Sequence, residues 1–218
     1  SNLKILIWGE QGPQDMVIWS SLLSQIKALA QCCTLECTPK LVPLFIRSFP
    51  EIHVQPENFE FDIDRKDFDY HLPIGSLFKH FTSNLLEGPE PKPFLKPNLK
   101  QVTYWKNRLN KLGSSPFVGI SWKSPLITPQ RSPNYTELWE WESIFKNCNA
   151  TFINLQSTDH LDDLDRVERD TGRRVHDFKD LDQFNNLDEV AALTKALDLT
   201  ISVSTAVAAI SAGVGTPT

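Results

Sequence analysis

Short apolar runs alternate with amphipathic stretches along the first part of the chain. Residues 4–8 form an apolar run, and Gly9 and Gly12 follow it before a stretch with apolar residues at the helical period opens near Asp15. This order predicts a strand, a tight loop and a helix. The positions that we expect to face a sheet are Val17, Ile18, Leu22, Leu23, Ile26 and Leu29.

The same alternation continues for some distance. It predicts strands at 34–37 and 52–55, with a helix from Pro39 to Phe49 between them, because proline suits the first turn of a helix. From residue 57 to residue 86 the periodicity is weaker. The elements indicated there are a strand-like or loop-like piece at 68–72 and a helix starting near Gly75.

The densest proline cluster lies at residues 88–98, and its composition favours extended backbone. We place a domain junction there. A helix is predicted at 99–112, with Gly113 as its C-cap. The elements predicted after it are strands at 117–121, 151–156, 174–178 and 199–203 and helices at 137–145, 161–171, 187–197 and 206–213.

Strands that alternate with helices in this way are typical of doubly wound parallel sheets. The predicted fold class is therefore α/β, with two Rossmann-like domains at residues 3–98 and 99–218. A second domain of this kind ordinarily adds another strand and helix, whereas the chain stops at Thr218. We therefore expect the second domain to be incomplete at its C-terminus.

Composition and charge exclude several classes of protein. The apolar share of 40% supplies a buried interior, and the net charge of −5 argues against a nucleic-acid partner. No apolar stretch reaches the length of a membrane-spanning helix. The four cysteines are Cys32, Cys33, Cys37 and Cys148. Their spacing is typical neither of a disulfide framework nor of a metal site. We therefore expect reduced thiols, no bound metal and a cytoplasmic protein.

Ligands of open α/β sheets bind beyond the carboxyl ends of the strands, and two facing sheets would form a cleft lined by such ends. The loop after the first strand leads to Asp15 at a predicted helix start. A carboxylate in that place could act as a general base and take a proton from a substrate hydroxyl. The alternative is that Asp15 only caps the helix, since Asp is a common N-cap.

Two later loops have the chemistry of an anion site. Lys123, Ser124 and Arg131 follow the strand at 117–121, and cations and hydroxyls there suit a diphosphate. Ser204 and Thr205 open the last helix, whose free N–H groups could also bind an anion. The alternatives are solvated cations and ordinary helix capping. A solvated face is also expected for the acidic residues Asp162, Asp163 and Asp165.

These motifs together resemble the heptosyltransferase-like glycosyltransferases, which form glycosyltransferase family nine, and in particular the branch attached to tetratricopeptide repeats. The similarity runs from Lys4 to Thr218. It is carried by WGEQGPQD, TLECTPKLVPLFIRSFPEIHV, HLPIGSLF, VGISWKS, FINLQ and LDLTISVSTAVAAISAGVGTPT.

The resemblance implies a GT-B architecture, in which the nucleotide sugar binds the second domain and the acceptor mainly the first. It implies that Asp15 is the general base of an inverting sugar transfer. It also implies that Gly12 and Gln14, in the same loop, lie on the acceptor side. It implies that Gln156 neighbours the nucleoside, and that the donor phosphates are contacted by Lys123, Ser124, Arg131, Ser204 and Thr205. No metal or other cofactor is implied, because cations and a helix start would neutralise the diphosphate.

The acceptor implied by the family is a glycan, a lipid-linked molecule or a protein. The chain departs from the family pattern at three residues: Gln14 replaces a loop glycine, Ser204 replaces a common Asp, and Ala209 replaces a common His. A non-catalytic binding module with the same fold is therefore an alternative. An NAD-dependent oxidoreductase is a second alternative, favoured by Glu36 at the end of the second strand, but Pro13 interrupts the glycine motif that it would need.

Overall fold

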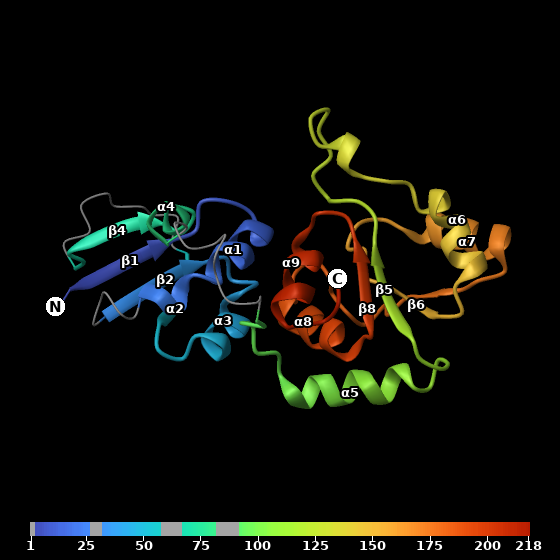
Figure 1. The fold of residues 1–218 in the computed structure, drawn as a ribbon, viewed down its shortest axis with the longest axis horizontal. Helices are drawn as coiled ribbons and strands as arrows, with labels where there is room; N and C mark the ends of the chain where they lie inside the picture. Colours follow the sequence, from blue (N-terminus) through green and yellow to red (C-terminus); the bar gives the residue numbers. More distant parts are fainter. Residues whose placement is uncertain (1–2, 27–31, 58–66, 82–91) are drawn as a thin grey trace. The chain divides into compact units, whose positions relative to one another are not determined.

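A computed structural model describes residues 3–26, 32–57, 67–81 and 92–218. Figure 1 shows that helices and strands alternate along the described chain. The chain divides into two compact units, Ser1–Lys96 and Pro97–Thr218. Each unit contains one parallel four-stranded sheet, so the predicted α/β fold class is confirmed.

The first unit is built on a sheet with the strand order β3-β2-β1-β4. The predicted strand at 4–8 is β1, and the weakly patterned region around 68–72 contains β4. The strands are β1 (Lys4–Trp8), β2 (Cys32–Cys37), β3 (His53–Pro56) and β4 (Tyr70–Pro73). The helices are α1 (Pro13–Ser20), α2 (Leu23–Ile26), α3 (Val42–Ser48) and α4 (Ser76–Phe81).

The single long helix predicted from Asp15 onward is wrong in one respect, because the chain forms two helices, α1 and α2. The hydroxyls of Ser20 and Ser21 donate to the carbonyls of Val17 and Ile18, and such local bonds compete with helix continuation. The side chain of Ile18 is 40% exposed, contrary to its predicted place against the sheet. Of the other predicted positions, those within the described residues are buried, and Leu29 lies outside them.

The second unit has a sheet with the strand order β7-β6-β5-β8. Its strands are β5 (Phe117–Ser121), β6 (Thr151–Asn154), β7 (Val175–His176) and β8 (Leu199–Ser202). Its α-helices are α5 (Leu99–Leu109), α6 (Glu142–Asn147), α7 (Leu161–Thr171), α8 (Leu187–Ala196) and α9 (Ala206–Gly213), and the 3-10 turns are η2 (Ser132–Asn134) and η3 (Leu138–Trp141).

Gly113 is not the C-cap of α5, which ends at Leu109 with Asn110 in that role. A Cβ atom on Gly113 would lie 2.7 Å from Oγ1 of Thr151, so the glycine permits a close approach to β6 instead. The helix predicted at 137–145 is divided between η3 and α6. By contrast, β5, α7 and α9 have the predicted bounds.

Helices cover both faces of the second sheet, so each face has its own core. One apolar cluster joins α5 and α8 to the sheet and includes Trp105, Phe117 and Leu193. The other joins α6 and α7 to it and includes Val118, Phe145 and Phe152. Neighbouring residues Phe117 and Val118 of β5 belong to different clusters, as expected for a strand covered on both sides.

We expect Gly119→Ala to destabilise the second unit. A Cβ atom there would lie 2.4 Å from Cδ1 of Leu155 and 2.6 Å from Cδ1 of Leu197, both in a packed core. Overpacking of this kind costs about 1–3 kcal/mol in the free energy of unfolding. Chemical denaturation of the variant measures this loss. Gly12→Ala is the matched control, because a Cβ atom meets nothing within 4 Å there, and an equal loss in both variants would contradict the packing argument.

Candidate functional site

Both sheets have the same topology, in which the chain adds two strands on one side of the first strand and then one on the other. The point where this direction reverses lies between β1 and β4 in the first unit and between β5 and β8 in the second. Ligands of open α/β sheets bind beyond the carboxyl ends of the strands at such points. The loops that follow these four strands are therefore the first places to examine.

In the first unit, hydrogen bonds join the loops that follow β1 and β4. The N–H of Ile74 donates to the carbonyl of Trp8 at 2.9 Å, and the N–H of Gly75 donates to Oε1 of Glu10 at 3.1 Å. A Cβ atom on Gly75 would lie 2.5 Å from the same Glu10 oxygen. Glycine at this position therefore allows Glu10 to fix the loop that leads into α1.

Asp15 is not the N-cap of α1, so the capping interpretation of this residue is wrong. The helix begins at Pro13 with Gly12 as its N-cap, and no side chain caps it. Asp15 lies in the first turn and Gln14 immediately precedes it. The Asp15 side chain is half-buried, and among the described residues it has no hydrogen bond or ion pair. Its carboxylate thus lies near a helix start, with no polar partner in the part of the chain that the structure describes.

Glu36, the residue that favoured an NAD site, has a structural role instead. Only 2% of it is exposed, its Oε1 accepts from Nε2 of Gln55 at 2.8 Å, and its carbonyl accepts from the N–H of Gly9 at 3.0 Å. Burial and the neighbouring Glu36 raise the pKa of Glu57. A buried side chain of this kind is poorly placed to bind a ribose hydroxyl.

In the second unit, Gln156 connects the loops that follow β5 and β6. It is 1% exposed, and its Oε1 accepts from the N–H groups of Trp122 at 3.0 Å and Lys123 at 3.1 Å. The same oxygen accepts from Oγ of Ser121 at 3.2 Å. Its Nε2 donates to the carbonyl of Lys123 and to Oγ1 of Thr158. Gln156 thus holds in place the backbone segment that carries Lys123.

The ammonium of Lys123 already has a carboxylate partner. Its Nζ lies 2.8 Å from Oδ2 of Asp163 on α7, which also accepts from Nε1 of the buried Trp122 at 3.1 Å. The prediction of a solvated face is therefore wrong for Asp163, whose side chain is only 20% exposed. Tertiary packing brings α7 against the loop after β5, which the sequence pattern of one helix could not reveal.

The other predicted donor contacts lie on exposed or half-buried loops. Ser124 is half-buried and its Oγ accepts from the N–H of Leu126. Arg131 is exposed and precedes η2. Both belong to the long connection that leaves the carboxyl end of β5, which Figure 1 shows projecting from the second unit.

The start of α9 lies beside this loop. The carboxyl ends of β5 and β8 are paired through Ser121 and Ser202, and the N–H of Val203 donates to the carbonyl of Ser121. Thr205 is the N-cap of α9, and its side chain contacts Oγ of Ser202 at 3.1 Å instead of capping the helix. The first N–H groups of α9 are thus available to an anion. Ser204, just before the cap, is exposed.

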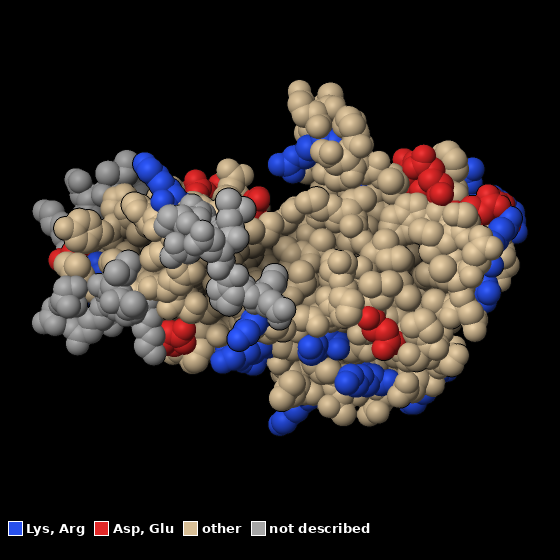
Figure 2. All heavy atoms as spheres, viewed as in Figure 1, with Lys and Arg blue, Asp and Glu red and all other residues tan. Residues whose placement is uncertain are grey.

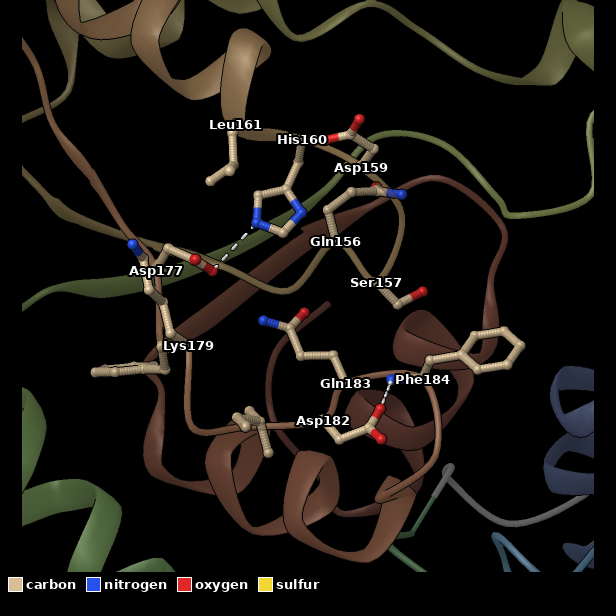
Figure 3. A pocket seen from close by; sticks show the side chains of 12 residues that line it. Gln156, Ser157, Asp159, His160, Leu161, Asp177, Lys179, Asp182, Gln183 and Phe184 are labelled. Carbon is tan, nitrogen blue, oxygen red and sulfur yellow. Dashed lines mark hydrogen bonds and ion pairs between the residues drawn. The ribbon is translucent and has the colours of Figure 1, made fainter.

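A pocket of about 460 Å³ opens on the other side of Gln156, beyond the carboxyl ends of β6 and β7 (Figure 3). Asp177 follows β7, and its Oδ1 accepts from Nδ2 of Asn154 at 2.8 Å and lies 3.3 Å from Nε2 of His160. The residues that line the pocket are Gln156, Ser157, Asp159, His160, Leu161, Asp177, Phe178, Lys179, Leu181, Asp182, Gln183 and Phe184.

The pocket residues other than Gln156 were missed in the sequence. Asp177 lay inside the strand predicted at 174–178, and it follows the strand only because β7 ends earlier, at His176, at the same edge of the sheet as Lys123 and Gln156. Gln183 carried no usable signal, because it comes from the connection between β7 and α8, which has no periodicity. Within the described residues, no group of three or more His, Cys, Asp or Glu could hold a metal ion.

Charge is spread over the second unit and is not concentrated in one place. Figure 2 shows Lys and Arg side chains interspersed with Asp and Glu on the face that it presents. Among the helices of the described part, none has the length and apolar character needed to cross a membrane.

Comparison with known proteins found one similar sequence and several similar structures. No protein-family model matches the chain. Protein FlbA of Caulobacter vibrioides is 30% identical over 228 residues, a match that covers 98% of this chain and 38% of that protein. The chain therefore spans well under half the length of this relative.

Two solved glycosyltransferases match nearly the whole chain. The family 9 glycosyltransferase of Veillonella parvula has a TM-score of 0.69 and 9% identity, with 100% of this chain and 80% of that one covered. The ADP-heptose lipopolysaccharide heptosyltransferase II of E. coli has a TM-score of 0.63 and 13% identity, with coverages of 99% and 83%. The chain therefore has the two-sheet α/β fold of the family 9 heptosyltransferases.

Proposed function

We propose that the chain is the part of a glycosyltransferase that binds the nucleotide sugar and carries out the transfer. The enzyme would move a sugar from a nucleotide-sugar donor to an acceptor hydroxyl. The observation that carries this proposal is the carboxyl edge of the second sheet. There the Lys123 loop, the start of α9 and the 460 Å³ pocket share one rim, with Gln156 between them. The solved relatives with this fold include an enzyme that uses ADP-heptose.

The pocket suits the nucleoside better than the phosphates. Its ionic side chains are mainly acidic, with Asp159, Asp177 and Asp182 against Lys179. Carboxylates repel a diphosphate but accept hydrogen bonds from a base and from ribose hydroxyls. Phe178 and Leu181 supply apolar surface, and the half-exposed ring of Phe184 lies at the edge of the pocket (Figure 3).

In this proposal the diphosphate binds on the side of Gln156 where Lys123 and the start of α9 lie. The N–H groups at the start of α9 and the Lys123 ammonium are positive, and Ser124, Arg131 and Ser204 are further candidate contacts. Together these groups could neutralise a leaving nucleoside diphosphate, so the proposed transfer needs no metal. Because Lys123 is paired with Asp163, a diphosphate would have to share or displace that carboxylate.

We propose further that Asp15 acts as the general base of an inverting transfer, with Gly12 and Gln14 on the acceptor-side loop. The absence of a hydrogen-bond or ion-pair partner for Asp15 among the described residues supports this role. A carboxylate that is not engaged in a hydrogen bond or an ion pair can accept a proton from a substrate. The acceptor would be a glycan, a lipid-linked molecule or a protein, and the predicted cytoplasmic location remains part of this proposal.

We expect Lys123→Ala to weaken binding of a nucleoside diphosphate. Loss of a hydrogen bond to a charged group costs about 1.5–3 kcal/mol, which corresponds to at least tenfold in the dissociation constant. Titration calorimetry with ADP, GDP, CDP and UDP measures the affinity. Lys146→Ala is the control, because that lysine pairs with Glu142 on the exposed face of α6. Equal affinity in the wild type and Lys123→Ala would place the phosphates elsewhere.

A non-catalytic binding module is the second candidate function. It is favoured by the start of α9, where Ser204 and Thr205 are followed by Ala209 in the second turn and no ionisable side chain is present. Release of nucleoside diphosphate from a bound nucleotide sugar, measured with and without acceptor, separates the two functions. A module binds the nucleotide sugar but releases no nucleotide in either case.

A further inference from the structure

Most of the pocket lining comes from residues 177–186, which connect β7 to α8 without helix or strand (Figure 3). Asn154 of β6 holds this connection at two points. Its Nδ2 donates to Oδ1 of Asp177 at 2.8 Å, and its carbonyl accepts from Nε2 of Gln183 at 3.1 Å. The turn between these points, at residues 178–181, is held from a different element.

That element is α5, through Arg108. Its guanidinium donates to both carboxylate oxygens of Asp180, from Nη1 at 2.5 Å and from Nη2 at 2.6 Å. The Cζ atom of Arg108 lies 4.4 Å from the ring centroid of Phe178 and 5.1 Å from that of Trp105 on α5. The two rings pack on each other, with centroids 4.8 Å apart. We call the contacts of Arg108 with Asp180 and Phe178 the Arg108 clamp.

The Arg108 clamp allows only a narrow range of geometries. A planar guanidinium that binds a carboxylate through two bonds and also stacks on an aromatic ring has few orientations open to it. The hydrogen bond from Arg108 holds the pKa of the Asp180 carboxyl below its ordinary value, so the pair is charged at neutral pH. The Asp180 side chain is 58% exposed, and exposed ion pairs contribute little to the free energy of unfolding. We therefore expect the clamp to act on the local order of the turn.

The turn that the clamp holds is a wall of the pocket. Phe178 is buried in the apolar cluster that contains α5 and also lines the pocket. Lys179 and Leu181, on either side of Asp180 in the sequence, line it as well. A ligand that had to order this turn on binding would lose affinity, whereas a turn that is already ordered avoids that cost.

We infer that Arg108 is a positioning residue, which orders the pocket wall from α5 through Asp180 and Phe178 and so raises the affinity for the ligand of the pocket. This inference rests on the proposed function, because it takes a nucleotide as that ligand. Neither Arg108 nor Asp180 is among the residues proposed above to contact the donor or the acceptor.

Alanine at either end of the ion pair tests the inference. We expect Arg108→Ala and Asp180→Ala each to weaken binding about threefold to tenfold, measured by titration calorimetry with the tightest-binding of ADP, GDP, CDP and UDP. The double variant should bind no more weakly than Arg108→Ala, because that change already removes the whole clamp. Arg166→Ala is the matched control and should keep the wild-type affinity. Arg166 stacks on Trp139 at 4.8 Å and pairs with Asp170, outside the pocket lining.

Asp180→Ala also separates positioning from a simple effect of charge. It removes a negative charge beside a pocket for an anionic ligand, so electrostatics alone would tighten binding, whereas loss of the clamp weakens it. Hydrogen exchange of the free protein gives a second readout. In Arg108→Ala the amides of residues 178–184 should exchange faster, and those of α7 should not.

The inference is overturned by unchanged affinity in both single variants, by tighter binding in Asp180→Ala, or by an equal loss in Arg166→Ala. It is also overturned by unchanged exchange at residues 178–184 in Arg108→Ala. In each case nucleotide binding by the wild type leaves the proposed function standing. If no nucleotide binds the wild type, the proposed function fails and the inference fails with it. Asp180→Ala, a change at an exposed side chain, decides the matter even if the melting curve of Arg108→Ala shows that it does not fold.

Discussion

The variant Asp15→Asn is expected to lose about 10²–10⁴-fold in the rate of sugar transfer, which is the usual contribution of a positioned general base. This loss corresponds to about 3–5 kcal/mol in the activation free energy. Asn has nearly the same shape as Asp but cannot accept the proton of an acceptor hydroxyl at neutral pH. Release of nucleoside diphosphate from the nucleotide sugar in the presence of acceptor is the measurement.

Binding and stability should hardly change in the same variant. Asp15 lies in the first turn of α1 and does not cap it, so its loss removes only a favourable interaction with the helix dipole, about 0.3–1 kcal/mol. Asp162→Asn is a matched control, since Asp162 is an exposed acidic residue in the first turn of α7. A fully active Asp15→Asn enzyme would end the catalytic assignment, and so would an equal loss of rate in Asp162→Asn.

The second large effect is expected for Gln156→Met. The change keeps the volume but removes the oxygen that accepts from Ser121, Trp122 and Lys123, and these donors are buried or nearly so. An unsatisfied buried donor costs about 1–3 kcal/mol, so the free energy of unfolding should fall by about 3 kcal/mol or more. Nucleotide affinity should fall with it, because the Lys123 loop loses its support. Chemical denaturation and calorimetry give the two quantities.

The exposed change Gln101→Met serves as the control for stability. Gln156→Glu is more informative, because it preserves the acceptor oxygen but places a second oxygen against the carbonyl of Lys123. It should therefore be destabilised as well. A stable Gln156→Met variant with unchanged nucleotide affinity would show that the hydrogen bonds of Gln156 do not hold the loop.

The predictions of secondary structure were most accurate where local signals mark both ends of an element. The helix α7 has the predicted bounds because Gly172, in the left-handed conformation at φ 69°, ends it. The helix α9 begins after Thr205, a residue type that favours the N-cap. Local signals were misleading at Gly113, which follows a helix as a C-cap would but is needed for the approach to Thr151.

Residues of the candidate site could be proposed from the sequence where a rule of topology applies. Residues that follow strands lie at one edge of a parallel sheet, so Lys123, Gln156 and Thr205 could be identified from the strands before them. Their partners could not. Asp163 lies on the face of α7 that packs toward Lys123, and only the packing of α7 on the sheet selects it from its acidic neighbours.

The sequence by itself thus determined the alternation of strands and helices and the parallel α/β fold class, because periodicity and capping act over a few residues. It also indicated the sheet edge that carries the candidate site. The tertiary structure alone decided that Gln156 supports a loop, that Lys123 is paired and that the buried Gln183 oxygen has no donor among the described residues. Those facts depend on contacts between residues far apart in the chain, where distance and burial decide which polar groups find partners.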